Sequence, residues 1–134
     1  GTTSQIVSSH TGEQLTVTLN YENPGIPPAA DIKGIDLVTE GVLTIGKTLD
    51  MLKRFPYMDR SEKVIALSKK DAASRLVRIL LEESTEVRFL VGRAINPAHQ
   101  NPEMPISLGL KLNLIKEMKA ELEKIGKIVN IEYF

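Results

Sequence analysis

The sequence predicts an α/β fold with a small, mainly parallel sheet, flanking helices and Rossmann-like layering. In the second half of the chain, an apolar β-branched segment is followed by a long helical pattern and then by an alternating segment. This order is typical of a βαβ unit, which places two strands in parallel with a helix against them. A length of 134 residues suits one domain with its own core, so we expect residues 1–134 to form a single α/β domain.

The elements of this unit follow from residue type and spacing. Val87 to Val91, "VRFLV", has the β-branched and aromatic content of a buried strand. Pro105 suits the first position of the helix, and Gly126 suits its end. Apolar residues at helical spacing form the stripe Leu108, Leu112, Ile115, Met118, Leu122 and Ile125. The final segment "KIVNIEYF" alternates and predicts a strand.

The first half is predicted to be more irregular at its start. We expect a helix over residues 4–10, capped by Thr2 or Thr3 and ended by Gly12, and then a strand from Gln14 to Leu19. Residues 23–34 contain three prolines and two glycines, which predicts an extended, irregular segment.

Two more helices are expected before the βαβ unit. The first lies within residues 35–55, with Asp36 or Thr39 as its cap and Pro56 marking its end. The second is "DAASRLVRILLEES", preceded by Ser68 and Asp71 in a spacing that resembles a capping box. Residues 57–63 between them are polar and charged, so we expect a mobile connector there.

Composition excludes several classes of function. Lys plus Arg and Asp plus Glu number 17 each, which gives no general attraction to nucleic acid or to anionic membranes. The chain has no cysteine, so it has no disulfide framework and no thiolate site, which fits a cytoplasmic protein. No segment approaches the roughly 18 consecutive apolar residues of a membrane span. We therefore expect neither nucleic acid nor a membrane as a partner.

The loop from Gly92 to Pro105, "GRAINPAHQNPEMP", is the first candidate site. It follows a predicted strand, and ligands of open α/β sheets lie beyond the carboxyl ends of strands. Arg93 suits an anion such as a carboxylate or phosphate, His99 suits a general base or metal ligand, and Asn96 and Asn101 supply amides. The alternative is that the two Asn-Pro pairs are turn formers and that the histidine is a half-buried packing residue.

Two further segments are candidates for the same crevice. Thr2 and Thr3 open a helix, where free N–H groups and hydroxyls suit an anion. Asp36 and Glu40, in "GIDLVTEG", suit a cation or a ribose hydroxyl. The alternative interpretation of both segments is plain helix capping. The two histidines are far apart in sequence and no cluster has ligand spacing, so we expect no metal site in this chain.

Three segments in order resemble a known family: "GTTSQIV", "GIDLVTEGVLT" and "VGRAINPAHQNPEMPISLGLK". They are similar to the C-terminal region of bacterial serine phosphatases of the stage II sporulation protein E family, which are metal-dependent 2C-type protein phosphatases. Gly1, Thr2 and Thr3 match the end of the family's Gly-Gly-Thr-Thr motif. The resemblance covers nearly all of the chain, and its third motif is long and specific.

The resemblance implies an accessory domain and no catalysis by this chain. The family's aspartates hold Mn²⁺ or Mg²⁺ in Asp-Gly and Gly-Asp-Asp motifs, and no aspartate here is followed by Gly or Asp. The metal centre is therefore expected upstream, in a catalytic domain that would be this domain's partner and would dephosphorylate phosphoserine or phosphothreonine proteins.

Three hypotheses about function follow. The first is a non-catalytic ligand-sensing or interaction domain that binds a small anionic ligand and regulates the phosphatase. Its crevice would be lined by Thr2, Thr3, Asp36, Glu40, Arg93, Asn96, His99 and Asn101. The second is a small-molecule enzyme with His99 as base, Arg93 as anion clamp and Glu40 as partner acid. The third is a homodimerisation module, which an exposed apolar patch on the final strand or long helix would favour.

Overall fold

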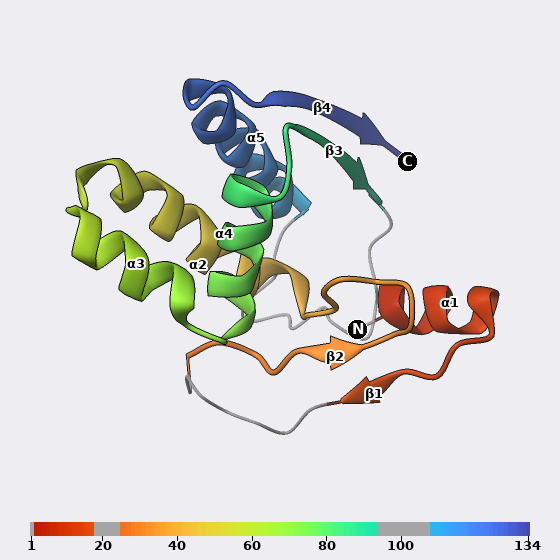
Figure 1. The fold of residues 1–134 in the computed structure, drawn as a ribbon. Coiled ribbons are helices and arrows are strands. Elements are labelled where there is room, and N and C mark those ends of the chain that lie inside the picture. Colours follow the sequence, from red (N-terminus) through yellow and green to blue (C-terminus); the bar gives the residue numbers. More distant parts are fainter. Residues whose placement is uncertain (1, 18–24, 94–107) are drawn as a thin grey trace. The chain divides into compact units, whose positions relative to one another are not determined.

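The computed structural model describes residues 2–17, 25–93 and 108–134 and has a mixed α/β architecture (Figure 1). The described residues form five α-helices, one 3₁₀ helix and two separate two-stranded sheets, one antiparallel and one parallel. The chain divides into two compact units, which we call the N-terminal unit (Gly1–Glu82) and the C-terminal unit (Glu83–Phe134). The described residues thus hold two small sheets in place of the one mainly parallel sheet that we expected.

The N-terminal unit begins with helix α1 (Thr2–Thr11) and the short antiparallel strands β1 (Thr16–Val17) and β2 (Ala30–Asp31). Gly12 has φ +74° and donates its N–H to Ser8 O at 3.0 Å, which confirms the glycine that ends α1. The prediction of Thr2 or Thr3 as a cap is wrong, because both residues already lie within the helix. The predicted strand Gln14–Leu19 begins two residues later than expected, at Thr16, and Leu19 lies in residues 18–24, which are outside the described part.

The rest of this unit is helical: α2 (Gly41–Arg54), the 3₁₀ helix η1 (Phe55–Tyr57), α3 (Arg60–Ser68) and α4 (Ala72–Glu82). Helix α4 packs against both α2 and α3. Its buried side chains are small or aliphatic and are Ala72, Ala73, Ser74, Val77 and Leu80. Helix α2 contributes Leu49 and Leu52 together with two buried threonines, Thr44 and Thr48. These side chains form the helical core of the unit.

The predicted mobile connector over residues 57–63 is wrong. Asp59 caps α3, because its Oδ1 accepts a hydrogen bond from the Glu62 N–H at 2.8 Å. Asp59 and Glu62 have the spacing of a capping box, so the polar composition of this segment reflects the start of a helix and not a loop. Pro56 lies in η1 directly after α2, which confirms it as the residue that ends that helix.

The caps of α2 and α4 also differ in part from expectation. Glu40 occupies the N-cap position of α2 and makes no side-chain capping bond, so the prediction of Asp36 or Thr39 as the cap is wrong. Thr39 instead shares a hydroxyl hydrogen bond with Thr44 at 2.9 Å.

The predicted capping box of Ser68 and Asp71 is wrong, because Ser68 is the last residue of α3 and donates its hydroxyl to Ile65 O at 2.8 Å. Asp71 itself caps α4, since its Oδ1 accepts the Ser74 N–H at 3.0 Å.

The C-terminal unit consists of β3 (Glu86–Val91), α5 (Leu108–Lys124) and β4 (Ile128–Tyr133). The two strands pair in parallel from Glu86 opposite Ile128 to Val91 opposite Tyr133, and α5 packs on β4 (Figure 1). The predicted βαβ unit is therefore confirmed. Its buried side chains are Val91 and Val129 of the strands and Ile115, Met118 and Leu122 of the helix.

Gly126 ends α5 as predicted. It has φ +86° and donates its N–H to Glu123 O at 3.0 Å, while Lys127 donates its N–H to Leu122 O at 3.1 Å. These two bonds form a Schellman motif, in which a glycine reverses the chain after a helix. The prediction of a buried strand at Val87–Val91 is wrong in part, because its residues alternate and Leu90 is 63% exposed.

Candidate functional site

Parallel pairing brings the ends of β3 and β4 to the same edge of their sheet. The pairing continues one step beyond the strands, because the Phe134 N–H donates to Val91 O at 3.0 Å and the Arg93 N–H donates to Phe134 O at 2.8 Å. Arg93 therefore lies at the carboxyl edge of the sheet, where both strands end. This edge is where open α/β sheets bind their ligands.

Two cations lie at this edge, which we call the carboxyl edge. The exposed Arg93 side chain directs Nε toward Phe134 O at 3.5 Å. Lys111, in the first turn of α5, donates from Nζ to Gly92 O at 2.7 Å. The Lys111 ammonium therefore lies beside the peptide bond that joins Gly92 to Arg93. Both side chains are held by carbonyl groups of the main chain.

Three other cations of the C-terminal unit lie beside a glutamate side chain, whereas Arg93 and Lys111 form no such pair among the described residues. Arg88 lies 3.9 Å from Glu132, Lys119 lies 3.5 Å from Glu123, and Lys124 lies 3.0 Å from Glu121. Within residues 2–17, 25–93 and 108–134, no aspartate or glutamate side chain forms an ion pair with Arg93 or Lys111. The carboxyl edge is thus a local concentration of positive charge.

Sequence reasoning found Arg93 and missed Lys111. Arg93 was recognisable because it follows an apolar strand and opens a polar loop. Lys111 stands among the leucines of "GLKLN", where a lysine looks like an ordinary solvent-exposed helical residue. A usable signal was present, because the first turn of a crossover helix lies at the carboxyl edge of the strands that it connects.

The other predicted site residues are distributed over the chain. Thr2 and Thr3 are exposed residues of α1, and Asp36 and Glu40 are exposed residues before α2, all in the N-terminal unit. Arg93 belongs to the C-terminal unit. The remaining three, Asn96, His99 and Asn101, lie outside the described residues.

Asp36 has a structural contact that the sequence did not suggest. Its main-chain oxygen accepts a hydrogen bond from Nη2 of Arg75 at 3.3 Å. One turn further along α4, Nη1 of Arg78 donates to Leu67 O at 3.1 Å. The two arginines therefore connect α4 to the segment before α2 and to the end of α3. The contact at Asp36 involves its main-chain oxygen and not its carboxylate.

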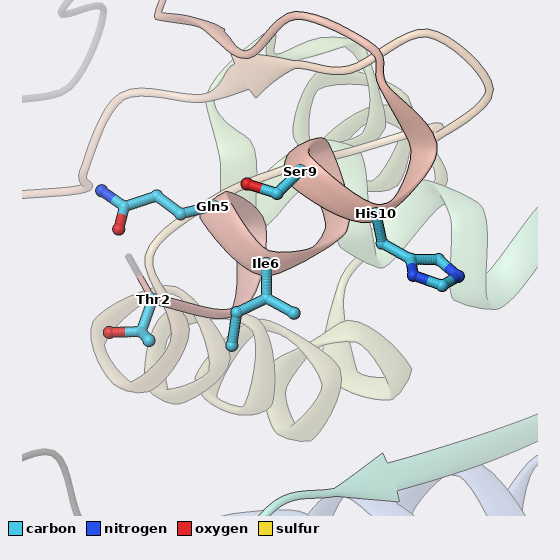
Figure 2. A pocket seen from close by; sticks show the side chains of 5 residues that line it. All are labelled: Thr2, Gln5, Ile6, Ser9 and His10. Carbon is cyan, nitrogen blue, oxygen red and sulfur yellow. The ribbon is translucent and has the colours of Figure 1, made fainter.

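A shallow hollow of about 410 Å³ lies along α1 (Figure 2). Its described lining residues share one face of the helix and are Thr2, Gln5, Ile6, Ser9 and His10. Their side chains carry hydroxyl, amide and imidazole groups, and Ile6 is 63% exposed. No α1 residue is buried, so the hollow is an open face of a helix without an enclosing wall among the described residues.

The part of the chain that the structure describes contains no group of three or more His, Cys, Asp or Glu side chains placed to hold a metal ion. None of the described helices is both long enough and apolar enough to cross a bilayer. Comparison of the chain with protein families, curated proteins and solved structures finds no match.

Proposed function

We propose that this chain is a non-catalytic regulatory domain of a phosphatase that resembles stage II sporulation protein E, and that it senses a small anionic ligand at the carboxyl edge. The observation that carries the proposal is the presence of two cations at this edge, Arg93 and Lys111, which form no ion pair with an aspartate or glutamate side chain among the described residues. The three sequence motifs support the link to the phosphatase, and Arg93 lies within the third of them.

Physical chemistry supports an anion as the ligand. An anion bound at this edge would be attracted to both side chains. Arginine presents a planar fork to a carboxylate or phosphate, whereas lysine acts as a compact charge. The first turn of α5 adds N–H groups and the positive end of the helix dipole. The proposed site also includes Asn96, His99 and Asn101 of the loop between β3 and α5.

Binding of simple anions tests the proposal. Thermal shift and calorimetry with inorganic phosphate, sulfate and acetate are expected to show binding by at least one anion. The double variant Arg93→Ala/Lys111→Ala should weaken that binding more than tenfold, because hydrogen bonds to charged groups contribute about 1.5–3 kcal/mol each.

The matched control is Arg88→Ala/Lys116→Ala, which removes one arginine from β3 and one lysine from α5 and thus the same charge. This control should bind the anion like the original chain. Equal losses of anion affinity in both variants would show that net charge alone causes the effect and would contradict a specific site.

Regulation is tested in a longer protein that carries a phosphatase domain upstream. The upstream phosphatase domain would be the cytoplasmic partner of this chain, and its own aspartates would hold Mn²⁺ or Mg²⁺. The anion should change the rate of phosphoprotein dephosphorylation, and Arg93→Ala/Lys111→Ala should remove the change while leaving the basal rate intact. A rate that ignores the anion would contradict a regulatory role even if binding were found.

The finer fold belongs to the same proposal. We propose Rossmann-like layering around a small, mainly parallel sheet that includes β3 and β4. The parallel pairing of the two strands and the crossover through α5 support it, because such units rarely stand alone. An experimental structure of the longer protein would test it, and a sheet with no further strand beside β3 or β4 would contradict it.

A dimerisation module is the second candidate, favoured by one observation on β3 and β4. Leu90 and Ile128 are each 63% exposed and lie on the sheet face opposite the buried Val91 and Val129. Light scattering over a concentration series should detect a dimer, which Leu90→Thr/Ile128→Thr should dissociate. Val17→Thr, at a comparably exposed strand position in β1, is the control. A monomer at high concentration would contradict this candidate.

A further inference from the structure

We infer that the outer face of α3 binds an amphipathic helix of a partner protein that carries acidic side chains beside its apolar stripe. The outer face consists of Ser61, Val64, Ile65 and Ser68, which are all exposed. Two observations carry the inference, namely aliphatic side chains that the described structure leaves uncovered and an excess of positive charge around them. It goes beyond the proposed function, because this face belongs to the N-terminal unit.

Helix α3 has apolar side chains on two sides. On one side it packs against α4 and buries Ala66 (Figure 1). On the other side, Val64 is 65% exposed and Ile65 is 60% exposed. With Ser61 and Ser68 they lie at spacings of three, four and seven residues, which places them along one stripe. Two apolar sides are typical of a helix that packs between two neighbours.

Helix propensity does not explain the two aliphatic side chains. Valine and isoleucine are β-branched, which restricts χ1 against the preceding turn and makes them poorer helix formers than alanine, lysine or glutamate. Burial against a neighbour normally offsets this cost, and Val64 and Ile65 gain little of it within the described structure. A partner that covered the outer face would bury both side chains.

The charge around α3 favours an acidic partner. Residues 41–82 contain nine Lys or Arg and five Asp or Glu, a net charge of +4, whereas residues 1–40 contain one and five, a net charge of −4. The neutral total of the chain therefore averages segments of opposite charge. At the ends of α3 the exposed cations are Arg60, Lys69 and Lys70, and none of them pairs with a carboxylate among the residues that the structure describes. Acidic side chains on a partner would be steered to this surface.

A protein helix fits the outer face better than a lipid bilayer does. Helices that lie on a membrane insert a broad apolar face with large side chains such as Trp, Phe or Leu. The outer face offers two aliphatic side chains between two serines, and the acidic Glu62 is exposed on the same helix. Tyr57, three residues before α3, is 90% exposed, and tyrosine is enriched in protein interfaces.

A matched pair of peptides tests the inference with the full chain. The acidic probe is a stapled helical peptide of two heptads with leucine at positions a and d, glutamate beside this stripe and alanine elsewhere. The basic probe has lysine in place of each glutamate. In NMR titrations the acidic probe should shift the amide signals of α3, and the basic probe should leave them unchanged. Added salt should weaken the binding, because the charges are exposed.

The apolar contribution is tested by Val64→Ser/Ile65→Ser, which should weaken binding of the acidic probe by about tenfold or more, since burial of these side chains is lost. Ile35→Ser/Leu43→Ser is the control, because it removes aliphatic side chains of the same unit that are 44% and 53% exposed. The control should bind the probe like the original chain. Melting curves check that both variants are folded.

The contribution of charge is tested by Lys69→Glu/Lys70→Glu, which should also weaken binding of the acidic probe by about tenfold or more. Lys33→Glu/Lys47→Glu reverses two other exposed lysines of the same unit and is the control for net charge. This control should lose much less affinity, and its melting curve is compared with that of the first variant.

Three results would overturn the inference. The first is no binding of the acidic probe, or equal binding of both probes, or equal losses of affinity in an α3 variant and its control. The second is binding of phosphatidylserine vesicles, without binding of the probe, that Val64→Ser/Ile65→Ser abolishes, which would assign the outer face to a membrane. The third is a shift of the α3 signals with protein concentration alone, which would assign it to a second copy of the chain. The anion test at the carboxyl edge is independent of all three.

Discussion

The cores of the two units differ in the small side chains that they bury. Beside aliphatic side chains such as Leu49, Leu52 and Leu80, the N-terminal unit buries small and hydroxyl side chains, namely Thr44, Thr48, Ala66, Ala72, Ala73 and Ser74. The C-terminal unit buries larger aliphatic side chains, namely Val91, Ile115, Met118, Leu122 and Val129. Small residues let helices approach closely, whereas large ones fill volume. At these small residues the N-terminal unit should therefore be sensitive to added atoms, whereas the C-terminal unit should be sensitive to lost atoms.

The largest expected effect is the loss of a side chain from the C-terminal core. Leu122 is fully buried in α5, and Leu122→Ala should lower the free energy of unfolding by about 2–5 kcal/mol because it leaves a cavity. Urea denaturation measures the change. Leu110→Ala removes the same atoms from a position on the same helix that is 45% exposed, and its smaller loss serves as control. Similar losses at both positions would contradict the assigned core.

The converse change tests the N-terminal core. Ala73 is fully buried in α4, which packs against α2 and α3. Ala73→Leu should destabilise the unit by about 1–3 kcal/mol, since added methyl and methylene groups force the helices apart. Ala120→Leu adds the same atoms to an exposed position of α5 and should change the melting temperature little. A stabilised Ala73→Leu variant would show that the space around α4 is loosely filled.

A smaller effect is expected at a helix start in the N-terminal unit. Asp71 accepts hydrogen bonds from the N–H of Ser74 at 3.0 Å and from its hydroxyl at 2.7 Å. Asp71→Ala should cost about 1–2 kcal/mol, because the buried Ser74 hydroxyl then loses its carboxylate partner. Asp59→Ala removes only one exposed capping bond, that of α3, and should cost less in the same thermal melts. The opposite ranking would contradict this account.

The smallest effects concern two glycines, and they should have opposite signs. Gly126→Ala should destabilise the C-terminal unit by about 1 kcal/mol, because a residue with a Cβ is strained at φ +86°. Gly46 lies inside α2, where an added Cβ meets no atom within 4 Å, so Gly46→Ala should stabilise by about 0.5–1 kcal/mol. The melting temperatures of the two variants should change in opposite directions. A change in the same direction would contradict the role given to one of the two glycines.

The C-terminal unit was more predictable from the sequence than the N-terminal unit. Its helix is long and periodic, and its glycine stop stands at the end of the apolar stripe, so Gly126 was placed correctly. Helix α3 was missed because its nine residues are mostly polar or exposed and only Ala66 is buried. Strand β2 (Ala30–Asp31) was missed because two residues are too few to show the alternation of apolar and polar side chains that indicates a strand.

In the candidate site, one residue was predictable from the sequence and the other was not. The position of Arg93 follows from local sequence, since a residue after a parallel strand must lie at the carboxyl edge. The role of Lys111 depends on a contact with Gly92, 19 residues away, which local patterns do not encode. The N-cap of α2 was predicted wrongly, because Asp36, Thr39 and Glu40 all stand near the start of this helix. Only the main-chain geometry shows that Glu40 occupies the N-cap position.

The parallel pairing of β3 and β4 has a consequence for the order of folding. Glu86 pairs with Ile128, 42 residues later (128 − 86), so closing the sheet requires a long loop to be ordered first. During synthesis, "VRFLV" emerges from the ribosome well before its partner strand exists. Until then its apolar side chains and unpaired edges are open to other chains. Aggregation of nascent chains should therefore fall when a chaperone covers this strand.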